Sequence, residues 1–62
     1  MTNVKNRAIY FLGDKVILSG EKFMVYGGWY YKGVYITGHK KGELVSIDIK
    51  YAHQQLLMMQ EN

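Results

Sequence analysis

Aromatic and basic side chains lie close together in the middle of the chain, between Tyr26 and Lys41. In the segment FMVYGGWYYKGVY, residues 23–35, the rings are separated only by small, aliphatic or basic residues. An exposed ring can stack on an unpaired base, and a neighbouring lysine can contact the phosphates. These residue types therefore predict a surface that binds single-stranded or structured nucleic acid. The residues expected to form it are Tyr26, Trp29, Tyr31, Tyr35, Lys32, Lys40 and Lys41.

The charge balance favours a partner with negative charge. The chain has 62 residues, with eight Lys and Arg against five Asp and Glu, which gives a formal net charge of +3. A basic protein attracts polyanions over a distance set by the ionic strength. Nucleic acid is thus the first partner that the composition suggests.

The same side chains suit a second hypothesis, in which the partner is another protein. Tyr, Trp and Met are enriched in the centres of protein interfaces. A small inhibitor of a host factor, of the kind encoded by phages or mobile elements, would expose such residues, and so would a homodimer. The residues expected to contact a protein partner are Trp29, Tyr30, Leu57 and Met58.

No set of residues predicts catalysis. Neither Ser19 nor Ser46 has the Gly-x-Ser-x-Gly surroundings of a nucleophile elbow. His39 and His53 fall short of the three protein ligands that a metal site needs, and the chain has no cysteine. We therefore expect a non-enzymatic protein without metal or cofactor. The lack of cysteine and of an apolar leader favours a cytoplasmic location.

Glycines divide the chain into short apolar runs, which predict a meander of antiparallel strands joined by tight turns. Segments such as ELVSIDIK alternate between apolar and polar residues, as half-buried strands do. The expected strands cover residues 8–12, 15–19, 22–26, 30–37 and 43–48.

The same alternation assigns sides to the tyrosines. Val34 and Ile36 fall on one face of their strand and Tyr35 on the other, and Phe23 likewise opposes Tyr26. If the aliphatic residues point into the core, both tyrosines point outward. This orientation is the basis of the predicted ligand-binding face.

The two ends of the chain differ from the middle. Residues 50–60 lack glycine and are rich in helix formers, so we expect a short helix capped by Asp48. Leu57 or Met58 should remain exposed, because one small core cannot cover every side of that helix. The polar residues 1–6 are expected to form a flexible arm.

Together these patterns resemble the SH3-like small barrels, including the Tudor and KOW modules. The similarity is carried by the segments GDKVIL, KFMV, GVYITG and ELVSI. It implies a mainly β fold, a single five-stranded antiparallel SH3-like barrel over residues 1–62 with a short C-terminal helix. Such modules bind nucleic acids or peptides through loops and aromatic residues. An OB-fold and a curled sheet with the helix packed across it are the alternatives.

Overall fold

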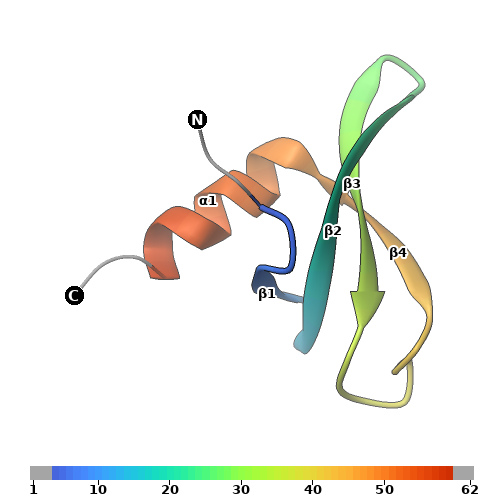
Figure 1. Ribbon diagram of the computed structural model, residues 1–62, viewed down its shortest axis with the longest axis vertical. Helices are drawn as coiled ribbons and strands as arrows, with labels where there is room; N and C mark the ends of the chain where they lie inside the picture. Colours follow the sequence, from blue (N-terminus) through green and yellow to red (C-terminus); the bar gives the residue numbers. More distant parts are fainter. Residues whose placement is uncertain (1–3, 60–62) are drawn as a thin grey trace.

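The structure, a computed structural model, describes residues 4–59. A single four-stranded antiparallel sheet curls into a half-barrel, in the order β1-β2-β3-β4, and one helix packs on its concave side (Figure 1). The elements are β1 (Ala8–Phe11), β2 (Asp14–Val25), β3 (Gly28–Tyr35), β4 (Leu44–Asp48) and α1 (Ile49–Met59). The fold is mainly β, with the C-terminal helix close to its predicted limits.

The described residues form four strands where the sequence predicted five. The predicted strands 15–19 and 22–26 are two halves of β2, which continues through Gly20. Both halves pair with β3, so the chain bends at this glycine without reversing its direction. A glycine in a sheet marks a bulge as often as a turn, and the sequence pattern does not distinguish the two.

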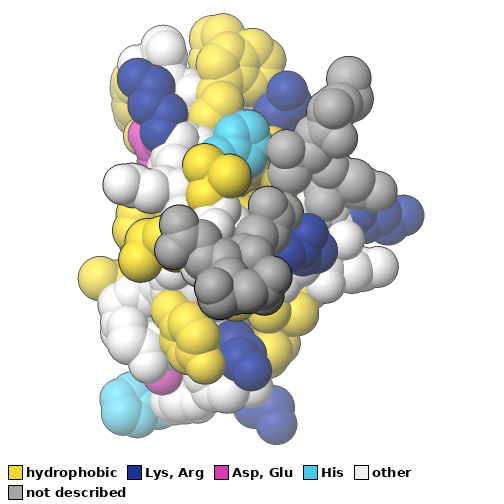
Figure 2. All heavy atoms as spheres, turned by 90° about the vertical axis from the view of Figure 1, so that its left-hand side faces the viewer, with side chains coloured by type: hydrophobic (Ala, Val, Ile, Leu, Met, Phe, Trp, Pro, Cys, Tyr) yellow, Lys and Arg dark blue, Asp and Glu magenta, His cyan; other side chains and the backbone are white. Residues whose placement is uncertain are grey.

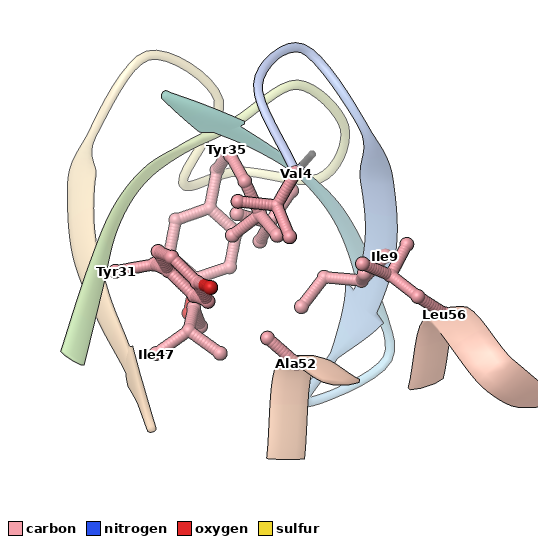
Figure 3. Close-up of a cluster of buried hydrophobic side chains, with 9 residues drawn as sticks. Val4, Ile9, Tyr31, Tyr35, Ile47, Ala52 and Leu56 are labelled. Carbon is pink, nitrogen blue, oxygen red and sulfur yellow. The ribbon is translucent and has the colours of Figure 1, made fainter. Parts of the chain in front are cut away.

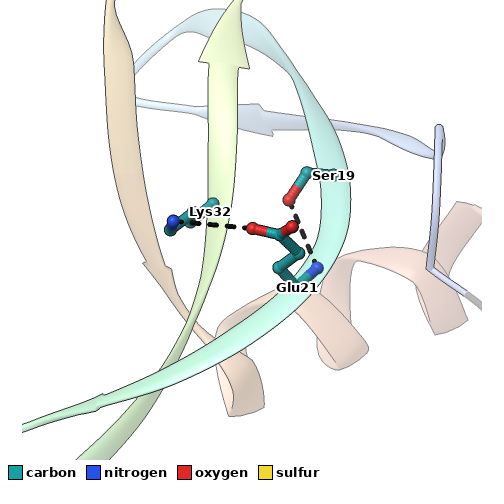
Figure 4. Close-up of polar contacts among 3 residues, drawn as sticks. All are labelled: Ser19, Glu21 and Lys32. Atoms are coloured by element: carbon teal, nitrogen blue, oxygen red, sulfur yellow. Dashed lines mark hydrogen bonds and ion pairs between the residues drawn. The ribbon is translucent and has the colours of Figure 1, made fainter.

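The bend in β2 is a bulge with a well-defined local geometry. Lys32 of β3 faces three residues of β2, Ser19, Gly20 and Glu21, before regular pairing resumes at Lys22. Gly20 has a φ of 91°, in the left-handed region that glycine tolerates best. The Ser19 hydroxyl accepts a hydrogen bond of 3.2 Å from the Glu21 backbone N–H (Figure 4). The bulge thereby strengthens the curl of the sheet.

Both tight hairpins are closed by a two-residue turn whose second residue is glycine. Leu12 and Gly13 have φ values of 54° and 85°, and Tyr26 and Gly27 have values of 49° and 79°. Positive φ at both central residues is the requirement of a type I′ turn, which matches the twist of the flanking strands. The first turn begins one residue earlier than the sequence predicted, because Asp14 already belongs to β2.

The hydrophobic core fills the space between the concave face of the sheet and α1 (Figure 3). Each of the four strands contributes at least one buried side chain to this core. No buried polar side chain in the described residues lacks a hydrogen-bond partner. The buried residues are Val4, Ile9, Val16, Leu18, Tyr31, Tyr35, Ile47, Ala52 and Leu56.

The orientation predicted for Tyr35 was wrong, and Tyr31 is also buried. Only 5% of Tyr31 and 4% of Tyr35 is exposed, and both rings point toward the helix (Figure 3). Val34, expected inside, lies on the convex face opposite Ile17. Apolar residues lie on both faces of β3. The alternation therefore identifies the segment as a strand, but it does not show which of the two faces is buried.

The start of the helix and the exposure of its apolar run agree with the sequence prediction. The Asp48 carboxylate accepts a hydrogen bond of 2.8 Å from the Lys50 N–H, which confirms the predicted cap. Ala52 and Leu56 are buried in the core. Leu57 is 65% and Met58 64% exposed, which confirms that part of this apolar run remains outside.

The segment that precedes β1 lies against the sheet. Val4 is 4% exposed, and the Asn6 N–H donates to the Leu18 carbonyl at 2.8 Å. Residues 4–6 of the predicted arm therefore pack on β2, and residues 1–3 lie outside the described part of the chain.

Candidate functional site

The end of the β2–β3 hairpin carries the most exposed aromatic side chains near the centre of the sequence. Tyr26, in the turn, is fully exposed at 104%, and the cross-strand neighbours Met24 and Trp29 are 57% and 46% exposed. Lys22 pairs with Tyr31, so Lys22, Met24 and Trp29 share the concave side. We call Lys22, Met24, Tyr26 and Trp29 the hairpin-end surface.

The hairpin-end surface extends beyond the part of the sheet that α1 covers. Figure 1 shows the β2–β3 hairpin projecting past the helix. Figure 2, which views the helix side, shows hydrophobic side chains at the upper end of this face with Lys or Arg side chains on either side. The core covers the concave face as far as Tyr31 and leaves the last cross-strand pair open to solvent.

The backbone of Tyr26 is unusual for its residue type. Its φ of 49° lies in the left-handed region, where asparagine and glycine are favoured and a bulky side chain is an outlier. Leu12 has the corresponding position in the other hairpin turn, with a φ of 54° and an exposure of 72%. Each of these residues adds backbone strain of about 1–2 kcal/mol and exposes an apolar side chain.

The residues predicted to bind nucleic acid do not lie on one surface. Tyr26 and Trp29 lie at one end of β3, whereas Lys40 and Lys41 lie in the loop that follows its other end. A strand of this length spans about 25 Å at about 3.3 Å per residue. Tyr31 and Tyr35 are buried and cannot stack on a base in this conformation.

Two of the predicted lysines contact protein groups. Lys40 Nζ lies 5.5 Å from the ring centroid of Tyr35. Lys32 Nζ lies on the convex side, 3.5 Å from a Glu21 carboxylate oxygen (Figure 4) and 6.0 Å from the Phe23 ring centroid. Because Lys32 lies on the opposite face from Trp29, the two cannot bind adjacent groups of one nucleotide.

The residues predicted to bind a protein partner are also divided. Trp29 and Tyr30 are consecutive in β3 and so point to opposite faces, where Tyr30 packs against Phe23 with 6.2 Å between ring centroids. Leu57 and Met58 are exposed on the helix. Of this set, only Trp29 belongs to the hairpin-end surface.

The sequence analysis missed Met24 and Lys22 as members of this surface. The pairing of Met24 with Trp29 depends on the register of the hairpin. That register follows from a two-residue turn at Tyr26-Gly27. Placing the turn there would have identified the pair.

A hydrogen bond joins β3 to α1 beside this surface. The Tyr31 hydroxyl lies 2.8 Å from His53 Nε2, and their ring centroids are 5.6 Å apart. Within residues 4–59, no three His, Asp or Glu side chains lie close enough together to hold a metal ion. No helix in that part of the chain is both long and apolar enough to cross a membrane.

Comparison with known proteins found no match to any family model, curated protein or solved structure.

Proposed function

We propose that this chain is a non-catalytic binding module that contacts another protein through the hairpin-end surface. The observation that carries the proposal is the grouping of exposed apolar side chains at the hairpin end, where the fully exposed Tyr26, at an unfavourable φ of 49°, lies beside the cross-strand pair Met24 and Trp29. Residues with a strained backbone conformation concentrate at functional sites. Met24 and Trp29, directly beside the turn, enlarge the exposed apolar area.

The size of the surface suits a small interface centre. An aromatic side chain buries about 150–250 Å² when it is covered, and buried Trp and Tyr side chains are frequent hot spots. Removing one such anchor typically lowers the binding free energy by about 2 kcal/mol or more. Lys22 supplies a charge on the same side, as the polar rim of an interface does.

The resemblance to SH3-like modules agrees with this proposal. A curled antiparallel sheet with short strands and glycine turns is the coarse architecture of such modules. The resemblance implies peptide binding through loops and aromatic residues, which is the chemistry of the hairpin end.

The chain provides a matched pair of variants to test the proposal. Tyr26→Asn and Leu12→Asn each place a residue that favours the turn at an exposed position of left-handed φ. Both variants should fold, and only Tyr26→Asn should lose the partner. The assay is capture of proteins from a nuclease-treated extract of the source cells, followed by measurement of the affinity of the purified partner. Equal affinity of both variants and the wild type would contradict the proposal.

A second candidate function is binding of single-stranded nucleic acid, favoured by Lys22 on the same side of the sheet as Trp29. Two exposed rings would contribute about 1–3 kcal/mol per stacked base. Affinity for a mixed-sequence oligonucleotide should then fall steeply between 50 and 200 mM salt, as phosphate contacts require. Absence of binding at the lower salt concentration would remove this candidate.

A further inference from the structure

Strand β4 forms one edge of the half-barrel, and no strand or helix within residues 4–59 pairs with its free side. Figures 1 and 4 show that side of β4 uncovered. The strand contains no lysine, proline or bulge, the features that commonly block pairing at an edge. An extended segment can therefore approach it.

The hydrogen-bonding groups on the free edge belong to Leu44 and Ser46. The Tyr35 N–H donates to the Glu43 carbonyl at 3.0 Å, so Glu43 directs its carbonyl toward β3. Backbone groups alternate in direction along an antiparallel strand. Val45 and Ile47 therefore bond to β3, while Leu44 and Ser46 present their N–H and C=O groups outward.

A groove lies beside this edge. It has a volume of about 250 Å³ and is lined by Phe23, Lys32, Leu44, Val45 and Ser46. This is below the ~300–1,000 Å³ of pockets for drug-sized ligands, so it suits one side chain of a larger partner. Leu44, which borders it, is 81% exposed.

The charge beside the groove favours a carboxylate. Lys32 is 58% exposed, and its pair with Glu21 at 3.5 Å is also open to solvent. An ion pair this exposed is weak, so a ligand carboxylate can replace or join Glu21 at low cost.

We propose that the free edge of β4 binds an extended acidic and apolar peptide segment of another protein by strand addition. The segment pairs antiparallel with Leu44 and Ser46, places an apolar side chain in the groove and directs a carboxylate to Lys32. This site lies on the convex side and is independent of the hairpin-end surface. Main-chain bonds provide affinity in this mode, and the groove provides selectivity.

A second copy of this chain fits the edge less well. Two β4 strands paired about a two-fold axis through Ser46 would place Leu44 opposite Asp48 of the second copy. That pairing sets an apolar side chain against a carboxylate that caps a helix. It also brings together two molecules that each carry a net charge of +3.

Three capped peptides test the proposal when titrated into the isotope-labelled full chain and followed by NMR. The first is Asp-Val-Leu-Val-Asp, the second replaces both aspartates by lysine, and the third carries an N-methyl group on the central leucine of the first. At low salt the first peptide should bind at least tenfold more tightly than either of the others. Its shifts should centre on the amides of Leu44 and Ser46.

Protein variants separate edge pairing from other modes of binding. Ser46→Pro removes an outward N–H without removing a bond to β3, and Ser46→Ala keeps that N–H as the control. Only the proline variant should lose the acidic peptide. If the Ser46→Pro variant does not fold, the comparison of the first peptide with its N-methylated form still tests edge pairing, because it uses the unaltered protein.

The remaining outcomes identify what would overturn the proposal. Equal affinity for the acidic and basic peptides, or undiminished binding of the N-methylated peptide, contradicts it. So does concentration-dependent dimerisation through β4 without peptide binding. Tyr26→Asn should bind the acidic peptide as the wild type does, whereas loss of binding in that variant would place the peptide at the hairpin end instead.

Discussion

Tyr26 and Leu12 hold equivalent positions in two similar turns, and each has a side chain that its backbone conformation disfavours. Asparagine before glycine is the preferred sequence for a type I′ turn. Tyr26→Asn and Leu12→Asn should therefore each raise the free energy of unfolding by about 1 kcal/mol. Urea denaturation measures this change. A loss of stability in Tyr26→Asn would show that the Tyr26 ring packs against the fold.

Tyr31 is both a core ring and a hydrogen-bonding partner of the helix. Tyr31→Phe removes only the hydroxyl that lies 2.8 Å from His53 Nε2. The free energy of unfolding should fall by about 0.5–1.5 kcal/mol, the usual net value of one hydrogen bond. Tyr26→Phe, which alters a fully exposed ring, is the matched control and should leave the stability unchanged. Equal stability of both variants would mean that the hydroxyl contributes nothing to the fold.

Within the strands, Gly33 is the position where the sheet has least room. A Cβ atom there would lie 2.7 Å from Val16 Cγ1 and 3.2 Å from the Ile17 carbonyl oxygen. Gly33→Ala should lower the free energy of unfolding by about 1–3 kcal/mol through overpacking of the core.

Gly28 in the same strand is the control for this prediction. Its Cβ would lie 3.3 Å from the Tyr30 ring, whose side chain can shift, and at an ordinary contact distance of 3.6 Å from the Val25 carbonyl oxygen. Gly28→Ala should therefore be the milder variant when the two melting curves are compared. An equal loss of stability in both variants would show that the effect does not depend on the space around the added methyl group.

For the strands and the helix, the sequence predicted most of the elements and their order. The apolar runs gave β1, β3 and β4, and the tail gave α1 with its Asp48 cap. The prediction of two separate strands in place of β2 was wrong, because Gly20 only bends this strand and both of its halves pair with β3. Local pattern carries no information about which strand a segment will pair with.

The candidate site was harder to predict than the elements. Tyr26 and Trp29 are exposed, as predicted, whereas Tyr31 and Tyr35 were predicted to be exposed and are buried. A domain of this size needs large side chains to fill its core, and here tyrosines fill part of it. The lysines were near the rings in sequence, yet β3 places Lys40 at the opposite end of the sheet from Trp29.

For the molecule as a whole, α1 completes the core that the half-barrel leaves open. Leu56 is 1% exposed, so Leu56→Ala should lower the free energy of unfolding by about 2–5 kcal/mol. That loss approaches the whole stability expected of so small a domain. The neighbouring Leu57 is 65% exposed, and Leu57→Ala should cost little. Thermal unfolding of both variants makes the comparison, and similar losses would contradict the packing of the helix on the sheet.

The division of the rings between interior and surface is the claim on which both the fold and the hairpin-end surface depend. Light-induced nuclear polarisation with a flavin dye measures it directly, because the dye reaches only exposed Tyr and Trp rings. Tyr26 and Trp29 should be strongly polarised, and Tyr31 and Tyr35 should give no signal. Polarisation of Tyr31 or Tyr35 as strong as that of Tyr26 would contradict the assignment.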